Sequence, residues 1–399
     1  MESMIKTWLV MHIIFLSSTY LHYCVNGKSQ VPCVFIFGDS LSDSGNNNNL
    51  PTSQKSNYKP YGIDFPIGPT GRFTNGRTSI DIITQLLGFE KFIPPFANTN
   101  GSDILKGVNY ASGGAGIRNE TSKARGFVVS LGLQLTNHRV IVSQISSRLG
   151  SLDKAQQYLN KCLYYVNIGS NDYINNYFLP QLYPTSHIYS PQQYAEALIQ
   201  ELSLNLLALH GIGARKFVLV GMGLLGCTPH AIFNHGTNGS CVEEENVHAF
   251  IFNAKLKSLV NHFLKFLADS KFIFINSTLE SDGRNGNNFS LQQNSLDSIV
   301  MHHVSWISGF AVSNAPCCPS KISGECIPEE RPCYNRSEYV FWDEFHPTEA
   351  RNLLTAIRSY DSHDSGFTYP MDIKHLVEHE TKMELESTNE IPSNLSTSS

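Results

Sequence analysis

Short apolar runs recur along this chain, and they constrain its fold more than any other feature. The clearest are residues 33–37, 163–168, 216–220 and 272–275, with a weaker run at 107–111. A strand that buries both of its faces needs apolar side chains at nearly every position. Such strands are typical of parallel sheets that are covered by helices on both sides. The pattern therefore predicts a buried, mostly parallel sheet.

Stretches with helical spacing of apolar residues lie between these runs. One is expected over 190–210, because Ser190 can cap a helix and Pro191 suits its first turn. Two more are expected over 243–267 and 348–360, where apolar residues recur every three to four positions. Strands that alternate with helices predict an α/β fold, here a three-layer α/β/α domain around a central, mostly parallel sheet. No internal repeat is visible.

The two ends of the chain differ in composition from the domain between them. An apolar run over 7–21 is followed by small residues, and this indicates a secretory signal peptide over 1–27. The alternative is an uncleaved membrane anchor, but the run is short and interrupted by polar residues. The folded domain is expected over 28–377, and the polar segment 378–399 is expected to be a disordered tail. No later segment has eighteen consecutive apolar residues, so no stable membrane span is expected.

The cysteines favour an oxidising compartment. The chain has nine, and eight remain if Cys24 leaves with the signal peptide. Cys227 is expected to pair with Cys241 across a short loop. The other cluster is expected to form disulfides among its members, and a zinc site is the less favoured alternative. Its members are Cys317, Cys318, Cys326 and Cys333.

Seven copies of the N-glycosylation acceptor tripeptide also favour secretion to the cell exterior. They begin at Asn100, Asn119, Asn238, Asn276, Asn288, Asn335 and Asn394. The net charge of −5 gives no indication of a nucleic-acid partner.

A candidate nucleophile follows the first apolar run. The block 37–45 reads Phe-Gly-Asp-Ser-Leu-Ser-Asp-Ser-Gly, with Ser40 just beyond the expected strand. In open α/β sheets ligands bind beyond the carboxyl ends of the strands, so Ser40 is well placed to meet a substrate. On its own, such a turn can equally be a simple helix cap.

A candidate base and its partner lie near the other end of the domain. Pro347 suits a helix start, so His346 is held just before the helix, and Asp343 lies three residues earlier. A serine hydroxyl needs a base to accept its proton, and that base needs a partner that fixes its tautomer. Asp343 and His346 can supply both functions from one short loop. The alternative is a surface Asp and His near a helix cap.

The sequence resembles the plant GDSL esterase/lipases, within the SGNH hydrolases, over about residues 32–378. Four blocks carry the resemblance: 37–45, Asn-Tyr-Ala-Ser-Gly-Gly-Ala-Gly at 109–116, Gly-Ser-Asn-Asp at 169–172, and Asp-Glu-Phe-His at 343–346. The resemblance implies an SGNH hydrolase-like fold and a catalytic triad of Ser40, Asp343 and His346. It also implies an oxyanion hole made by the backbone N–H of Ser40, a glycine N–H and the side chain of Asn171. The glycine is assigned to Gly114, with Gly113 as the close alternative.

A second motif competes with this interpretation. Residues 221–226 match the dinucleotide fingerprint Gly-x-Gly-x-x-Gly, but the helix and second strand that the fingerprint requires do not follow. Three smaller features have simple explanations: 46–49 as a polar loop beside the nucleophile, the pair 302–303 as histidines without further metal ligands, and 243–245 as the acidic first turn of a helix.

These observations predict a secreted serine ester hydrolase that cleaves carboxylic esters, of lipids or of other acyl or acetyl compounds, through an acyl-enzyme intermediate. No cofactor or metal is expected. Two alternatives stay open: an acyltransferase that uses the same triad, and a secreted binding protein with an inactive site. Lipid, cutin, acetylated polysaccharide and small acetylated metabolites all remain possible substrates, and the sequence gives no indication of the oligomeric state.

Overall fold

A six-stranded sheet forms the centre of the molecule. The computed structural model describes residues 29–99, 104–236, 238–280, 309–362, 364 and 366–378. The strand order is β2-β1-β3-β4-β5-β8, and only β8 runs antiparallel to its neighbour within this sheet. The strands are β1 (Val34–Gly38), β2 (Gly107–Asn109), β3 (Leu163–Asn167), β4 (Lys216–Val220), β5 (Lys271–Ile275) and β8 (Thr368–Tyr369). The five apolar runs therefore form the five parallel strands, as predicted.

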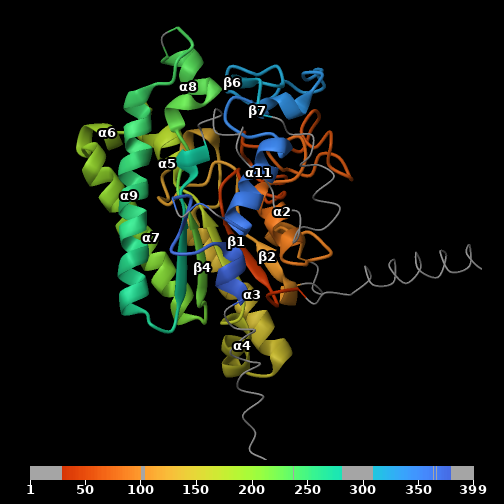
Figure 1. Ribbon diagram of the computed structural model, residues 1–399, viewed down its shortest axis with the longest axis vertical. Coiled ribbons are helices and arrows are strands. Elements are labelled where there is room, and N and C mark those ends of the chain that lie inside the picture. The colour runs from red at the N-terminus through yellow and green to blue at the C-terminus, as the bar shows by residue number, and fades with distance from the viewer. Residues whose placement is uncertain are drawn as a thin grey trace, which may run out of the picture.

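Helices cover both faces of this sheet (Figure 1). One face packs against α3 (Leu131–Leu149), α4 (Leu152–Leu159), α7 (Pro191–Gly211) and α9 (Glu243–Phe266). The other packs against α2 (Ser79–Leu86) and α11 (Glu349–Tyr360). Shorter helices are α5 (Ser170–Asp172), α6 (Thr185–Ile188) and α8 (Pro229–Asn234). The predicted three-layer α/β/α architecture is confirmed.

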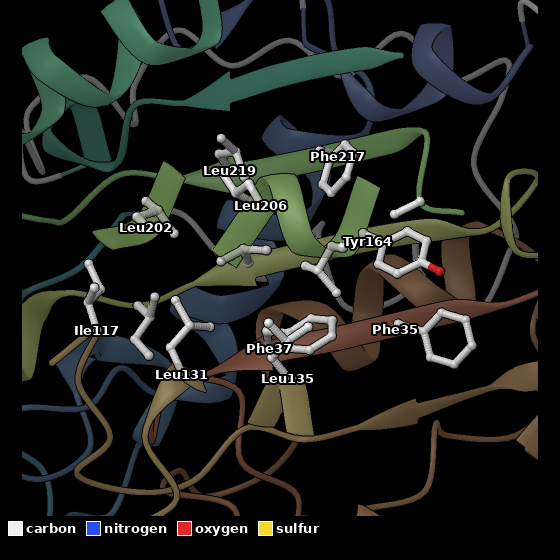
Figure 2. Close-up of a cluster of buried hydrophobic side chains, with 14 of the residues drawn as sticks. Phe35, Phe37, Ile117, Leu131, Leu135, Tyr164, Leu202, Leu206, Phe217 and Leu219 are labelled. Atoms are coloured by element: carbon white, nitrogen blue, oxygen red, sulfur yellow. The ribbon is translucent and has the colours of Figure 1, made fainter. Parts of the chain in front are cut away.

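Alternation along the strands builds two cores from one sheet. Phe35 and Phe37 of β1 point into the layer of α3 and α7, where Figure 2 shows them among other buried side chains. Val34 and Ile36, their neighbours on the same strand, face α2 and α11. Both faces of β1 are thus removed from water, which is why its sequence is apolar at every position instead of at every second one.

The three expected helices form close to their predicted bounds. Ser190 accepts a hydrogen bond from the backbone of Gln193, whose side chain bonds back to the backbone of Ser190, so a capping box opens α7. Residues 243–245 form the acidic first turn of α9, as expected. Thr348 caps α11, and Pro347 precedes it, so the chain ahead of this helix holds a fixed direction.

Four disulfides tie the described chain together. Cys227 pairs with Cys241, and the cysteine cluster forms two internal pairs, as predicted. The sequence analysis proposed no partner for Cys33, which bonds to Cys162. These two residues precede the neighbouring strands β1 and β3, so this bond joins the strands at their amino ends. Across the ranges described, no helix has both the length and the apolar character that a membrane crossing needs.

The strand order brings three separate sequence blocks to one edge. Strand β1 lies between β2 and β3, and Gly38 at its end pairs with Asn167 at the end of β3. The chain leaves β1 toward Ser40, β2 toward Gly114 and β3 toward Asn171. In doubly wound sheets, ligands bind at the point where the strand order reverses, which here lies between β1 and β3.

Candidate active site

A chain of hydrogen bonds links Ser40, His346 and Asp343. The Nε2 atom of His346 lies 2.7 Å from Oγ of Ser40, and its Nδ1 atom lies 2.8 Å from both carboxylate oxygens of Asp343. Ser40 follows β1 of the central sheet. The other two residues follow β7 (Tyr339–Phe341), which pairs with β6 (Val312–Pro316) in a separate two-stranded sheet. Residues 306 positions apart in the sequence thus lie in direct contact.

The loop that carries Asp343 and His346 is fixed by its own carboxylate. Oδ1 of Asp343 accepts the backbone N–H groups of Phe345 and His346, each at 2.8 Å. The N–H of Trp342 donates to the carbonyl oxygen of His346 at 2.7 Å, which closes the loop from the other side. Asp343 therefore sets the backbone of the loop as well as facing the imidazole ring.

Tyr61, which the sequence analysis missed, completes the surroundings of Asp343. Its hydroxyl donates to Oδ2 of Asp343 at 2.6 Å and accepts the N–H of Cys326 at 3.1 Å. Tyr61 is fully buried in a small cluster with Phe73, Trp342 and the disulfides of the cysteine cluster. Burial and the negative charge of Asp343 raise the pKa of Tyr61 well above its usual value, so its hydroxyl stays a donor.

Two opposing effects act on the charge of His346. The residue is 6 % exposed, and the ring of Phe73 lies against it at 4.9 Å between centroids. Burial lowers the pKa of His346, but the charge and hydrogen bond of Asp343 outweigh burial, with smaller contributions from Asp39 and Glu325. The net result is a pKa above the usual value of 6.5.

The backbone N–H groups of Ser40 and Gly114 have no hydrogen-bond acceptor within the described chain. Gly114 has a φ of +80°, a conformation that favours glycine. The N–H of Gly113, in contrast, donates to Oδ2 of Asp43 at 2.9 Å. Of the two glycines that the sequence left open, Gly114 therefore has the available donor.

Asn171 points its amide toward the same region. Its Nδ2 atom donates to the carbonyl oxygen of Ala115 at 3.0 Å, and its Oδ1 atom accepts a hydrogen bond from Asn175 at 2.7 Å. The oxygen and one amide proton are thus engaged, which fixes the orientation of the group and leaves the second proton available. Asn171 lines the same cavity as Ser40 and His346.

The glycine loop of the second block is held from both sides by polar residues. Asn47 donates to the carbonyl oxygen of Gly113 at 2.8 Å, and Asn46 donates to that of Ala111 at 2.7 Å. On the other side, Asp172 accepts the N–H of Ile117 at 2.8 Å. Residues 46–47 were expected to form a simple polar loop. The segment is a polar turn, as expected, but Asn46 and Asn47 are buried, because the carbonyl groups of the second block need donors.

Three buried carboxyl groups lie around this loop. Burial raises the pKa of Asp39 to about 7, that of Asp43 to about 6 and that of Asp172 to about 7. Hydrogen bonds from backbone N–H groups oppose the shift in each case but do not cancel it. The sequence analysis gave Asp43 and Asp172 no role, because acids within motifs look the same whether they are buried or exposed.

A cavity of about 630 Å³ opens at the candidate triad. Part of its wall is apolar and includes Ile174, Met222, Leu225, Ile232 and Phe345. Another part is polar and includes Gln54, Arg125 and Glu325. The cavity is large enough for a small-molecule ester with substituents on both sides of the scissile bond.

The fingerprint-like segment 221–226 contributes to this cavity. The N–H of Met222 donates to Oδ1 of Asn253 at 2.8 Å, and that of Gly226 donates to Oδ1 of Asn246 at 2.9 Å. A dinucleotide site needs free N–H groups at the start of a helix. Here two asparagines of helix α9 accept these two N–H groups. A short 3₁₀ turn contains Gly226, and the helix that follows, α8, begins only at Pro229.

The acceptor asparagines occupy different environments. Asn119, Asn238 and Asn335 are exposed, and Asn276 is half-buried. The acceptor sites at Asn100, Asn288 and Asn394 lie outside the described residues, as do the histidine pair 302–303, the expected signal peptide and all but the first residue of the expected tail.

Comparison with known proteins gives a consistent answer. A model of the family described as GDSL-like Lipase/Acylhydrolase matches residues 34–358. The chain is 44% identical over 381 residues to GDSL esterase/lipase At1g29670 of Arabidopsis thaliana, covering 95% of this chain and 100% of that protein. It is 44% identical over 354 residues to GDSL esterase/lipase At4g18970 of the same plant, covering 88% of this chain and 93% of that protein.

A third Arabidopsis thaliana protein, GDSL esterase/lipase At1g29660, is 43% identical over 382 residues, covering 95% of this chain and 100% of that protein. The match to the family model spans the five parallel strands of the sheet, the candidate nucleophile and the loop of Asp343 and His346. The resemblance inferred from the four blocks is thereby confirmed. The chain belongs to the GDSL-like lipase/acylhydrolase family, a family of carboxylic ester hydrolases.

Proposed function

We propose that this protein is a secreted serine ester hydrolase that works through an acyl-enzyme intermediate, with Ser40 as nucleophile. The observation that carries the proposal is the continuous hydrogen-bond chain from Ser40 through His346 to Asp343. A serine hydroxyl at hydrogen-bond distance from an imidazole, itself oriented by a carboxylate, is the arrangement that activates serine for attack.

The reaction has two halves. The Oγ atom of Ser40 attacks the ester carbonyl carbon while His346 accepts the hydroxyl proton. His346 then returns this proton to the departing alcohol, and the acyl group stays on Ser40. Water attacks the acyl-enzyme in the second half, again giving its proton to His346, and the carboxylic acid leaves as the Ser40 hydroxyl re-forms. Asp343 orients the imidazole and stabilises its charged form in both halves.

Negative charge on the carbonyl oxygen needs donors in each half. We assign this role to the N–H groups of Ser40 and Gly114 and to the side-chain amide of Asn171. The two unpaired N–H groups and the amide proton left over on Asn171 support this assignment. Donors that are fixed before the reaction stabilise such charge without reorganising, and each contributes about 3–4 kcal/mol in well-studied cases.

Secretion is part of the proposal. The apolar segment within 1–27, the four disulfides and the exposed acceptor asparagines support it. Disulfides persist in oxidising compartments and are rare in the cytosol. The related alternative is transfer of the acyl group to an alcohol instead of water, which uses the same first half. Adding increasing concentrations of an alcohol acceptor distinguishes the two, because a transferase makes new ester at the expense of free acid.

Substitution of Ser40 tests the central claim. Ser40→Ala should lower ester hydrolysis by at least a thousandfold with secretion and folding intact, because it removes the attacking atom and little volume. Ser44→Ala is the matched control: it lies in the same block and is buried, and its hydroxyl has no partner among the described residues. It should keep the wild-type rate within about twofold. A Ser40→Ala variant with more than a tenth of wild-type activity would rule out the mechanism.

A further inference from the structure

Three polar side chains form one part of the wall of the active-site cavity. Gln54, Arg125 and Glu325 come from three separate segments of the chain and line the same cavity as Ser40 and His346. The sequence analysis singled out none of them. They contrast with the apolar part of the wall, to which α8 and the segment after β4 contribute.

Glu325 is the fixed centre of this group. It is 5 % exposed, and its Oε1 atom accepts a hydrogen bond from Nε2 of Gln54 at 3.1 Å. Its Oε2 atom accepts a hydrogen bond from the hydroxyl of Ser323. A carboxylate oxygen can accept more than one hydrogen bond, so both oxygens still have lone pairs for a ligand.

Arg125 has unused donors. Its closest polar contact is an ion pair of 3.7 Å between Nη1 and Oε1 of Glu325, too long for a hydrogen bond. Within the described chain its guanidinium makes no hydrogen bond, so its five N–H groups are available at the cavity wall. The carbonyl oxygen of Arg125, in contrast, accepts the N–H of Ser53 at 2.9 Å. The backbone therefore holds the loop, and the side chain is free for another task.

The group lies next to the reacting atoms. The Cγ atom of Gln54 lies 3.0 Å from the position that a Cβ atom on Gly114 would take, so Gln54 packs against the proposed oxyanion loop. The charge of Glu325 is one of the influences that raise the pKa of His346. The oxygen of the departing alcohol must lie beside Nε2 of His346 to receive its proton. The polar wall is therefore close to the alcohol portion of a bound ester.

We propose that Gln54, Arg125 and Glu325 form a subsite for a neutral, hydroxyl-rich alcohol portion of the substrate, such as a sugar or polyol. The inference rests on the proposed ester hydrolase function and specifies its substrate class. Neighbouring hydroxyls each accept one hydrogen bond and donate another, so they match a guanidinium and a carboxylate placed side by side. An anionic alcohol is disfavoured because Glu325 offsets the charge of Arg125. A purely apolar alcohol would remove water from both charged groups without offering either a new hydrogen bond.

Two esters with the same acyl group test this subsite. The full secreted protein is assayed with 6-O-butyrylglucose and with ethyl butyrate, and the ratio of their kcat/KM values is measured. We expect wild type to favour the glucose ester by about tenfold or more, since hydrogen bonds to charged groups are stronger than those between neutral groups. Arg125→Ala should lower that ratio at least tenfold. Arg125→Lys should lower it too, because an ammonium lacks the planar fork.

Arg148→Ala is the matched control, because Arg148 is an exposed arginine on α3 that does not line the cavity. It should leave both rates unchanged. A ratio that does not change in Arg125→Ala would overturn the proposal, as would a wild-type preference for ethyl butyrate. A larger Arg125 dependence for the butyryl ester of lactate, whose alcohol portion carries a carboxylate, would make this an anion site and also overturn it. Failure of the proposed function is distinguishable, because Ser40→Ala would then still hydrolyse both esters.

Discussion

Asp343 does more than orient one imidazole ring. Its carboxylate accepts hydrogen bonds from two backbone N–H groups of its own loop and from the hydroxyl of Tyr61, in addition to His346. These hydrogen bonds spread its negative charge, so they limit how strongly it attracts the proton on His346. The effective basicity of His346 is thus set by residues that never contact substrate.

Tyr61→Phe tests this positioning role. The change keeps the ring and removes one donor to Asp343, so the carboxylate attracts the imidazolium proton more strongly. We expect the acidic limb of the kcat/KM profile to move to higher pH, and kcat to fall about tenfold with KM nearly unchanged. Tyr58→Phe is the control, because the Tyr58 hydroxyl donates to the carbonyl oxygen of Cys326 and does not touch Asp343. An acidic limb at the same pH in Tyr61→Phe would show that Tyr61 only fills space.

The acidic limb of wild type should itself lie above pH 6.5. His346 must be neutral to accept the proton of Ser40, and its pKa is raised because Asp343 outweighs the effect of burial. Activity should therefore be present above this pKa and be lost as the pH falls through it. Asp343→Asn should move the limb downward and lower the rate by orders of magnitude, because the ring can then adopt the wrong tautomer. A wild-type midpoint below pH 6 would contradict this sign.

Asn171→Ala isolates one oxyanion donor. The amide is proposed to bind charge that exists only in the transition state, so its loss should lower kcat about a hundred- to a thousandfold and change KM little. Steady-state kinetics with a soluble ester provides both values. An unchanged kcat would remove Asn171 from the oxyanion hole and leave it as a support for the carbonyl group of Ala115.

At the scale of elements, β1 and β3 determine whether the site assembles. Their parallel pairing aligns Gly38 with Asn167, and the Cys33–Cys162 disulfide joins them at the opposite end. The register is therefore fixed at both ends of the pair. A slip by one residue would turn every side chain of β1 to the other face of the sheet and move the chain that carries Ser40.

Removing this disulfide should destabilise the protein more than removing the shorter one. Cys33 and Cys162 are 129 residues apart, and Cys227 and Cys241 are 14 apart. The chain-entropy model gives about 5 kcal/mol for the longer loop and about 3 kcal/mol for the shorter. Urea denaturation of the two double Cys→Ala variants, each beside wild type, measures both changes in the free energy of unfolding. The opposite ranking would show that loop length does not control the effect.

At the scale of the whole molecule, activity and stability should respond to pH in opposite directions. Asp39, Asp43 and Asp172 have pKa values of about 7, 6 and 7 in the folded protein, raised from 3.8 by burial. Groups with raised pKa values stabilise the folded state below their unfolded value, and this contribution is lost as pH rises through the folded value. His138 acts oppositely: burial lowers its pKa to about 3, so its contribution is lost as pH falls below 6.5.

We expect the free energy of unfolding to fall between pH 5 and 7.5 by at least about 1.4 kcal/mol, the equivalent of one pKa unit. Three carboxyl groups act in this direction, and His346 adds to them because its pKa is also raised. Urea denaturation of the oxidised protein at several pH values within this window provides the measurement. A steady rise in stability from pH 5 to 7.5 would show that the carboxyl groups are ionised in the folded state at lower pH than their burial implies.

The sequence by itself determined the parallel sheet, three of its covering helices (α7, α9 and α11) and the candidate residues of the site. Burial on both faces leaves a continuous apolar signature, as in residues 34–37, and helix starts such as Ser190-Pro191 act locally. The pairing of Cys227 with Cys241 was also predictable, because the two residues are close along the chain. The roles proposed for Ser40 and His346 could be inferred from short motifs, since each motif is one contiguous loop.

The tertiary structure alone decided what surrounds those residues. Tyr61 and Asp343 are 282 positions apart, and Gln54 and Glu325 are 271 apart, so no local pattern connects them. Only the structure shows that the N–H of Gly113 donates to Asp43 and that of Gly114 has no acceptor within the described chain. The direction of the pKa shift of His346 depended on burial weighed against charge. Each of these depends on residues that are far apart in the sequence and meet only in the folded domain. Sequence motifs indicate the candidate site residues, whereas packing determines their hydrogen-bond partners and their protonation.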